Sequence, residues 1–593
     1  MGVNDLETKL EYTYQNILRK YGFSEGADAQ SVNGIVKESI QRFMSECNNP
    51  AIYCNGLHTR MLMTDFIFEM KKVKYIVDNY KEEQTEGGYC IIKDEELEQE
   101  GVDGVIISTY VYRGQVLESL SKKHETIKYL DLYAELEKKG IKLKGNYYAV
   151  GGIHAHYRTI NALQRRLQEH EADAAKIYEK LLEEYVQIKD FRTAILAAQS
   201  YNKRFPSDKT EALIKDLQNI YALEKDMLAN LSDKNVLMFC MDGLRRKDVT
   251  QESMPKLTEG VSSKSYVYQN AYSVSTSTFE SLCPAYSQNY DLRTKYYEKN
   301  MIREEECNFV MEAKKEKRQI YFYTNTDYYV ESDWIQFRIE PQTATEKIWY
   351  FLLDALKEKA GLFYIHASES HFTFPNPYTM EKLLAEGMSM IYDFLPVKGQ
   401  KLRADYESQH ADMVRYLDDI LAPLLSEIPC RMVFFADHGN LLLGKNCKLE
   451  DVSRTALTCG EEWIRIPYLV KSPEMGTGTD DDLISLMSIG DIVISLMKRQ
   501  PYRQEKLPFV KVVRSRLYNP DMEKVYKMRG EERSLQAFEA FIFQEGYKLV
   551  VYEDGTAAVF RVSDDSEIED EEITITLLER IRKYITVCED TKL

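Results

Sequence analysis

The residues best suited to chemistry stand at the ends of two apolar runs in this sequence. The run 236–241 ends in Asp242, and the run 431–436 ends in Asp437 and His438. Such runs are typical of strands buried on both faces, and an open α/β sheet places its site at the carboxyl ends of its strands. Two carboxylates and an imidazole at one edge are suited to a divalent metal ion. The pattern therefore predicts a metal site, although Asp242 also fits a plainer interpretation as a helix N-cap.

A hydroxyl-rich segment and a loop histidine offer further reactive groups. The run 273–287, SVSTSTFESLCPAYS, can place one hydroxyl at a helix N-terminus, where backbone N–H groups favour an anion. His371 lies in the loop sequence SESHFTFPNPY, and Arg245 follows the first acidic strand end closely enough to contact an anionic substrate. The plainer interpretations are a capping loop, a packed histidine and a solvated turn.

Taken in this order, the segments resemble the alkaline-phosphatase superfamily in its sulfatase-like branch, and most of all phosphoethanolamine transferases and lipoteichoic acid synthases. The family's GTxTxxSxPC-like run is matched by STSTFESLCP, which puts Thr278 at the nucleophile position. Its SHxP-like loop is matched around His371, and its SDHGE-like strand end by ADHGN. EEWIRIPYLVKSP and SIGDIVISL match a later strand and helix, so the resemblance covers roughly residues 233–560.

The resemblance implies a metal-dependent enzyme with a threonine nucleophile. One divalent ion, Zn or Mn, would lower the pKa of the Thr278 hydroxyl, which attacks phosphorus and forms a phosphothreonine. His371 would bind the phosphate or protonate the leaving group, and Arg245 would contact the substrate. The implied metal ligands are Asp242, Thr278, Asp437 and His438.

Departures from the family pattern narrow the predicted reaction. The CxPxR run of sulfatases is missing and Cys283 is off register, which favours phosphoryl over sulfate esters. No histidine follows His438, which favours one metal ion over two. We therefore expect a phosphotransferase or phosphodiesterase. A role in surface-glycan modification is implied only by the N-terminal region, which resembles the small Rossmann-like domains found beside enzymes of surface-polysaccharide metabolism. The alternatives are a sulfatase-type ester hydrolase and a catalytically degenerate protein that binds a nucleotide or glycan.

Composition excludes some classes of protein. The chain has 593 residues with 44% hydrophobic and 29% charged residues, which is typical of a soluble globular protein. Its net charge of −18 argues against a general nucleic-acid binder. We expect no transmembrane helix and no signal peptide, and the ten scattered cysteines favour a reduced, cytoplasmic location. The expected partner is a small-molecule or glycan phosphoester, and the oligomeric state is left open.

The predicted fold class is α/β, with an alkaline-phosphatase-like mixed sheet flanked by helices. Strand–helix alternation predicts a small Rossmann-like domain in front of it. That domain keeps an acidic residue, Asp78, after its second strand, but only Gly56 remains of the GxGxxG fingerprint, so a vestigial or regulatory role is favoured and nucleotide binding stays open. The predicted segments are N-terminal helices (1–49), the Rossmann-like domain (50–135), a helical connector (136–232), the catalytic domain (233–540) and an α+β subdomain (541–593).

Overall fold

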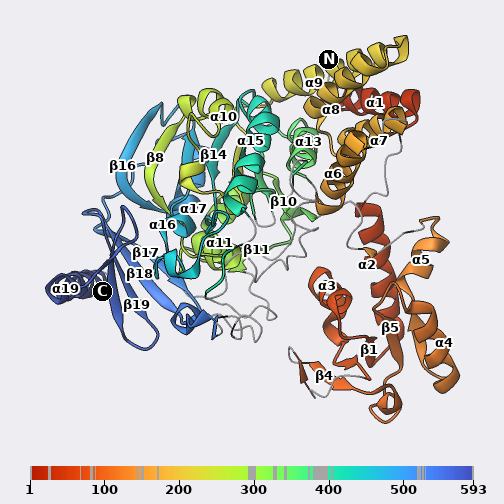
Figure 1. Ribbon diagram of the computed structural model, residues 1–593, viewed down its shortest axis with the longest axis horizontal. Helices are drawn as coiled ribbons and strands as arrows, with labels where there is room; N and C mark the ends of the chain where they lie inside the picture. Colours follow the sequence, from red (N-terminus) through yellow and green to blue (C-terminus); the bar gives the residue numbers. More distant parts are fainter. Residues whose placement is uncertain are drawn as a thin grey trace. The chain divides into compact units, whose positions relative to one another are not determined.

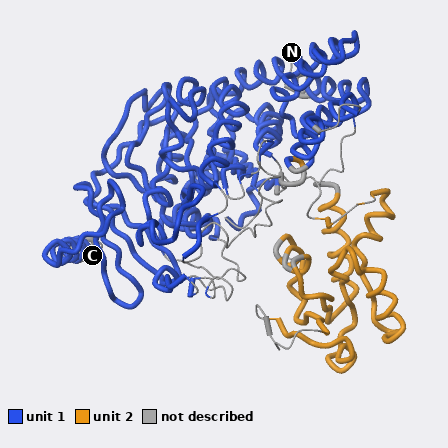
Figure 2. Tube along the Cα trace, in the orientation of Figure 1, with its two compact units in different colours: residues 1–23, 157–593 blue, residues 24–156 orange. Residues whose placement is uncertain are grey.

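The structure is a computed structural model. It describes residues 3–23, 29–66, 69–79, 85–86, 89–141, 143, 146–147, 153–169, 173–290, 302–324, 330–339, 343–371, 374, 376–377, 399–402, 405–516, 523, 526–527 and 529–590. The chain divides into two compact units, shown in Figure 2. Unit 1 comprises residues 1–23 and 157–593, and unit 2 comprises residues 24–156.

Unit 2 is built on a six-stranded sheet in the order β3-β4-β2-β1-β5-β6. All neighbouring strands are parallel except the edge pair β3 and β4. The strands are β1 (Pro50–Tyr53), β2 (Tyr75–Val77), β3 (Thr85–Glu86), β4 (Tyr89–Ile92), β5 (Gly104–Ile107) and β6 (Lys128–Leu130). The helices are α2 (Ala29–Glu46), α3 (Leu57–Asp65), α4 (Arg113–Lys123) and α5 (Leu132–Lys138).

Apolar side chains cover both faces of this small sheet, as parallel sheets require. One cluster joins α2 and α5 to strand residues such as Ile52, and the other joins α4 to residues such as Val105. At the carboxyl end of β1, the ring of His58 is hydrogen-bonded to Ser108 and Tyr133. Burial lowers the pKa of His58 to about 4. This histidine is therefore a neutral, structural member of the unit at physiological pH.

The core of unit 1 is an eight-stranded mixed sheet in the order β12-β10-β13-β7-β14-β15-β8-β16. The first five strands of this order run parallel, and β15 is antiparallel to both of its neighbours. The strands are β7 (Val236–Met241), β8 (Tyr266–Tyr272), β10 (Ile320–Thr324), β12 (Ile335–Ile339), β13 (Leu362–Ala367), β14 (Arg431–Phe435), β15 (Tyr468–Lys471) and β16 (Gly478–Ser485). Every residue of β7, β13 and β14 is buried, as their apolar runs predict.

Helices flank this sheet in two packed groups (Figure 1). In one group, α17 contacts β7, β14, α11 and α12; in the other, α15 contacts α10 and α13. These helices are α10 (Pro255–Gly260), α11 (Thr278–Ser287), α12 (Asn308–Lys315), α13 (Ala344–Ala355), α15 (Tyr406–Leu425) and α17 (Ile489–Met497). The short elements β9 (Ile302–Arg303), β11 (Val330–Glu331) and α16 (Glu461–Ile464) complete this region.

The helical segment before the sheet packs onto α13, one of the helices that flank the sheet. α9 contacts α1, α8 and α13, and the ring of Trp349 on α13 meets Tyr14 of α1 and Phe191 of α8. The segment therefore shares a core with the sheet domain. Its helices are α1 (Val3–Tyr21), α6 (Ile153–Glu169), α7 (Ala174–Gln187), α8 (Phe191–Arg204) and α9 (Asp208–Ala229).

A five-stranded antiparallel sheet and a helix end the chain. The buried Lys548 ammonium ties this sheet to the central region by binding the carboxylates of Glu461 and Asp565 and the carbonyl of Cys459. The elements are β17 (Phe509–Arg514), β18 (Phe538–Phe543), β19 (Tyr547–Tyr552), β20 (Ala557–Arg561), β21 (Glu567–Ile568) and α19 (Glu571–Asp590).

The predicted α/β class, with a mixed sheet flanked by helices and a small, mainly parallel sheet before it, is confirmed. The structure divides the chain more coarsely than the five predicted segments. α1 belongs to unit 1 and α2 to unit 2, although both fall within the N-terminal segment predicted for residues 1–49. The C-terminal sheet begins at Phe509, before the predicted boundary at 541. The predicted boundaries themselves stay a prediction.

Glu224 on α9 provides a test of this packing. Its side chain is buried, neither carboxyl oxygen has a hydrogen-bond partner among the described residues, and burial together with Asp190 raises its pKa from 4.5 to about 8. The folded state thus holds a proton that the unfolded state has released at neutral pH. Protonation of Glu224 therefore contributes to the stability of the folded state. This contribution is complete below pH 4.5 and is lost as the pH rises to about 8. We expect Glu224→Gln to stabilise unit 1 at pH 8 by about a few kcal/mol and to change little at pH 5.

Urea unfolding followed by tryptophan fluorescence measures this effect, because Trp334, Trp349 and Trp463 all lie in unit 1. Glu211→Gln, at an exposed position of the same helix, is the matched control and should follow the wild type at every pH. Equal stability of Glu224→Gln and wild type from pH 5 to pH 8 would contradict the burial of a protonated carboxyl here.

Candidate active site

Three neighbouring parallel strands carry the predicted reactive residues to one edge of the central sheet. β7 pairs with β13 on one side and with β14 on the other, and Cys240 stands in register with both His366 and Phe435. The residues that follow the strands therefore meet at the same edge. This places Asp242 after β7 beside Asp437 after β14, as their positions in the sequence predict.

Thr278 reaches the same edge from the first turn of α11. Ser281 fixes the preceding loop on this turn, because its hydroxyl donates to the Ser275 carbonyl and accepts from the Ser275 N–H. Glu280 adds a second tie by accepting from the Ser275 hydroxyl at 3.0 Å. The N-cap residue Ser277 makes no side-chain capping hydrogen bond, so the contacts of Ser275 with Glu280 and Ser281, rather than a cap, hold Thr278 at the helix N-terminus.

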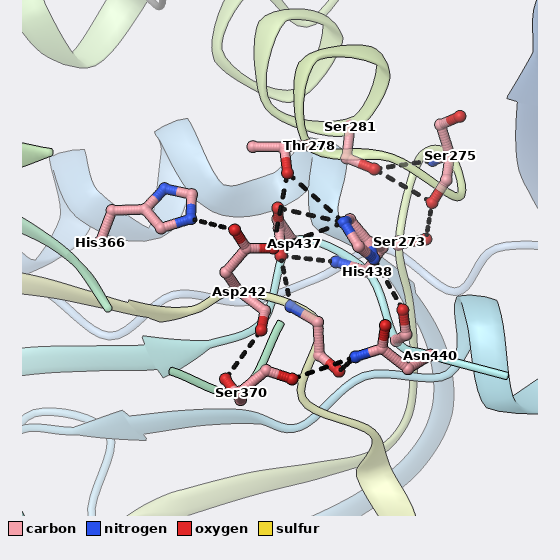
Figure 3. A network of polar contacts seen from close by, with 12 residues as sticks. Asp242, Ser273, Ser275, Thr278, Ser281, His366, Ser370, Asp437, His438 and Asn440 are labelled. Carbon is pink, nitrogen blue, oxygen red and sulfur yellow. Dashed lines mark hydrogen bonds and ion pairs between the residues drawn. The ribbon is translucent and has the colours of Figure 1, made fainter. Parts of the chain in front are cut away.

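The polar groups converge closely, as Figure 3 shows. Thr278 Oγ1 lies 3.5 Å from Asp242 Oδ1 and 3.4 Å from His438 Nε2. His438 Nε2 is also 3.5 Å from Asp242 Oδ1 and 3.7 Å from Asp437 Oδ2. The four residues predicted as metal ligands therefore come together in one place.

Two overlapping groups of side chains are arranged to hold a cation. Asp242, His371 and His438 form one group and Asp242, His366 and Asp437 the other, with ligand atoms that within each group all lie within 4.8 Å of one another. Three of the four predicted ligands, Asp242, Asp437 and His438, are thus divided between two groups that share Asp242. His371, predicted to face the substrate, belongs to the first group, and its ring lies edge-on to that of His438 with the ring centroids 5.7 Å apart.

The hydrogen bonds leave a place that suits positive charge, either a metal cation or a proton on the ring of His438. His438 Nδ1 donates to the Gly439 carbonyl at 2.7 Å, so in the neutral ring Nε2 carries a lone pair and faces carboxylate oxygens. Asp437 is fully buried, and its Oδ2 has no hydrogen-bond partner among the described residues. Lone pairs that face one another in a buried place repel unless a cation lies between them. The donor set, with carboxylate, imidazole and hydroxyl groups, therefore fits a divalent transition metal.

The electrostatics around Asp242 follow from its neighbours. Burial raises the pKa of Asp242, but His371, His366 and His438 outweigh this effect and hold its pKa below the ordinary value. Behind the site, burial lowers the pKa of Lys347 to about 8, against the effect of Glu369. Lys347 Nζ donates to the His366 carbonyl at 2.6 Å, so a buried ammonium supports the end of β13.

The turns that carry the acidic residues are locked to one another. Asp437 Oδ1 accepts from the Gly243 N–H at 3.1 Å, and the Ser370 hydroxyl donates to the Asp242 carbonyl at 2.7 Å. Gly243 has φ +72°, a conformation that strains a residue with a Cβ. At Gly439, a Cβ would lie 2.0 Å from the Glu462 carbonyl oxygen. Both glycines after the acidic strand ends are therefore required by geometry.

Arg245 is held away from a simple substrate-binding role. Its side chain is buried and forms two hydrogen bonds with Asp248, at 2.7 and 2.8 Å, and an ion pair with Glu462 at 2.8 Å. Neither a solvated turn nor a free anion-binding group describes this arginine. The role predicted for it in substrate binding stays a prediction.

Sequence reasoning missed His366. Its Nε2 lies 3.3 Å from Asp242 Oδ2, and its Nδ1 is 2.9 Å from the Tyr364 hydroxyl. A histidine at the end of the apolar run LFYIH is most simply interpreted as a core residue. Only the pairing of β13 with β7 reveals that this strand end adjoins Asp242.

Comparisons with known proteins give matches among solved structures. No protein-family model and no curated protein sequence matches the chain. BT1596, a 2-O GAG sulfatase, matches with 12% identity and a TM-score of 0.39, over 60% of this chain and 92% of the other. The phosphonate monoester hydrolase SpPMH from Silicibacter pomeroyi has 11% identity and a TM-score of 0.41, over 60% and 96%. The C-terminal periplasmic domain of EcEptC from Escherichia coli has 14% identity and a TM-score of 0.31, over 48% and 90%.

These proteins resemble the chain in fold alone. At such identities and TM-scores the chemistry has to be inferred from this chain's own side chains. Within the residues that the structure describes, no helix has both the length and the apolar character needed to cross a membrane.

Metal binding at this edge can be measured directly. Asp242 belongs to both groups of ligands, so Asp242→Asn should weaken the binding of Zn²⁺ or Mn²⁺. We expect a loss of at least about tenfold, because even changes to residues that support a metal ligand weaken metal binding by this much. Equilibrium dialysis with elemental analysis gives the affinity and the number of ions bound. Asp405→Asn is the control, because Asp405 is an aspartate that caps α15 and belongs to neither group. Equal metal binding by Asp242→Asn and wild type would remove Asp242 from the site.

Proposed function

We propose that the protein is a metal-dependent phosphotransferase or phosphodiesterase in which Thr278 is the nucleophile. The observation that carries the proposal is the position of Thr278 Oγ1, at 3.4 Å from His438 Nε2 and 3.5 Å from Asp242 Oδ1. A hydroxyl at a helix N-terminus beside a group of metal-type ligands is the arrangement that activates an alcohol as a nucleophile. Neither helix capping nor core packing accounts for this set of contacts.

The site's own residues prepare the nucleophile. Ser275, Ser281 and Glu280 fix the loop and the first turn of α11, so the Thr278 hydroxyl is held in place before substrate binds. Asp242 and His438 lie on the other side of the hydroxyl. A divalent ion bound by these groups supplies the positive charge that lowers the pKa of a coordinated hydroxyl and stabilises phosphoryl oxygens.

The reaction has two balanced steps. In the first, Thr278 Oγ1 attacks phosphorus; the new O–P bond forms as the bond to the leaving oxygen breaks, and the hydroxyl proton passes to solvent. The backbone N–H groups at the start of α11 favour charge on the phosphoryl group. In the second step, water or an acceptor hydroxyl attacks the phosphothreonine and gives its proton to His371, which is neutral after protonating the leaving oxygen; the Thr278 O–P bond breaks, and the Thr278 oxygen takes a proton from solvent.

His371 is the residue best placed to act on the leaving group. It follows β13 in the loop that also holds Ser370, and its ring faces His438. In this proposal the protonated imidazole of His371 gives its proton to the leaving oxygen, or binds a phosphoryl oxygen. We also propose that the substrate is a glycan phosphoester and that the reaction takes part in surface-glycan modification.

Turnover of bis(para-nitrophenyl) phosphate, compared with para-nitrophenyl sulfate, tests the reaction. With Mn²⁺ or Zn²⁺ present, we expect the diester to be the better substrate and Thr278→Ala to lower kcat/KM at least about a thousandfold. Thr278→Ser keeps the hydroxyl and should retain part of the activity. Rapid acid quenching and mass spectrometry should find a phosphorylated peptide that contains Thr278.

Metal content is the control in this experiment, because Thr278→Ala should keep most of the metal that Asp242 and His438 bind. Unchanged turnover in Thr278→Ala would remove this residue from the mechanism. Preference for the sulfate ester would instead favour the sulfatase-type hydrolase that the sequence leaves as an alternative.

A further inference from the structure

A polar pocket lies in unit 1, and none of the residues that line it belongs to the candidate active site. Its volume is about 290 Å³, and it lies between the segment 454–458, the segment 530–534 and Tyr552 of β19. This volume is at the lower limit of the range of about 300–1,000 Å³ found for small-molecule sites. The pocket therefore fits a ligand of about the size of one sugar.

Two arginines line the pocket, Arg454 and Arg533. Arg533 forms no ion pair with any residue that the structure describes; one of its terminal nitrogens donates to the Thr556 hydroxyl, and its guanidinium lies over the Tyr552 ring, 4.0 Å from the ring centroid. Its Nε is buried with no hydrogen-bond partner in the described chain. Arg454 has a side chain that is 70% exposed, and its ion pair with Glu567 spans 3.8 Å. The terminal nitrogens of two guanidinium groups that line one pocket favour an oxyacid group as the ligand.

The remaining lining groups limit the ligand further. Glu531 and Glu532 also line the pocket, and carboxylates accept hydrogen bonds from hydroxyl groups but repel a bare inorganic anion. Thr458 and Ser534 add small polar side chains. A ligand that carries both an acidic group and several hydroxyls can accept hydrogen bonds from the arginines and donate them to the glutamates. We propose that this pocket binds an acidic sugar, with its phosphate, sulfate or carboxylate group on Arg454 and Arg533 and its hydroxyls on the two glutamates.

The pocket wall is connected to the helix that begins at Thr278. Arg514, buried at the end of β17, donates to the carbonyls of Ser534 and Gln536 at 2.5 and 3.0 Å. The next residue, Ser515, donates from its backbone N–H and its hydroxyl to the carboxylate of Glu280 on α11. Binding in the pocket can therefore reach the candidate nucleophile through two hydrogen-bonded steps. Only this last consequence rests on the proposed function; the binding itself does not.

Calorimetric titration of the full-length Thr278→Ala protein, stripped of metal with EDTA, tests the pocket separately from the candidate active site. The probes are glucose 6-phosphate, glucuronate and neutral glucose, at constant ionic strength. We expect the two acidic sugars to bind saturably and glucose not to bind. Arg454→Gln and Arg533→Gln should each weaken binding at least about tenfold, as the loss of a charged hydrogen bond does. The fluorescence of Trp463 should change on binding, because its indole N–H donates to the carbonyl of Ala456, which lies in the chain between the lining residues Arg454 and Thr458.

Arg580→Gln is the matched control, because Arg580 is an arginine of the same subdomain that pairs with Glu545 at 3.1 Å and does not line the pocket. This variant should bind like the parent protein. Absence of saturable binding by both acidic sugars, equal binding of glucose, or unchanged affinity in both pocket variants would each overturn the proposal. Because Thr278→Ala is the parent in every titration, such a result would leave the proposed phosphoryl chemistry standing.

Discussion

The candidate active site depends on one buried atom, Asp437 Oδ2, which has no hydrogen-bond partner among the described residues. It faces His438 Nε2, which in turn faces Asp242, so three groups rich in lone pairs are held with successive separations of at most 3.7 Å in a low-dielectric place. Leaving buried charges uncompensated costs several kcal/mol, and a bound cation or a protonated histidine ring offsets this cost. Metal binding and the stability of these loops are therefore coupled: the same ion would relieve the repulsion and activate the hydroxyl of Thr278.

Rigid surroundings keep the reactive groups close despite their repulsion. The Asn440 amide donates to the carbonyls of Gly243 and Ser370, which joins the turns after all three strands in one hydrogen-bonded unit. The Gly439 N–H donates to the Trp463 carbonyl at 2.7 Å, and this close approach leaves no space for a side chain. The geometry of the site is thus fixed by backbone groups, which change less than side chains when a ligand binds.

The sequence predicts those features of the fold and site that depend on local pattern. Apolar runs that end in Asp242 and Asp437 predict buried parallel strands. The run of serines and threonines predicts a helix that begins with a hydroxyl residue, and the helix begins at Thr278. His366 could not be found in this way, because its role comes from a strand neighbour that is distant in the sequence. For Arg245, the sequence shows a charge beside a site but not the carboxylates of Asp248 and Glu462 that bind it, since Glu462 is 217 residues away.

The segment predicted as a connector has a closer role in the site than its helical pattern indicates. The Tyr157 hydroxyl of α6 donates to Glu369, and the Asn161 amide donates to the carbonyl of Asn376, so α6 holds one residue on each side of His371. Glu369 also accepts from the N–H of Ala344 at the start of α13, which joins the same loop to the helix that contains Lys347. Displacing α6 would release the loop on both sides of His371. The position of His371 therefore depends on Tyr157, which lies 212 residues before its contact Glu369 in the sequence.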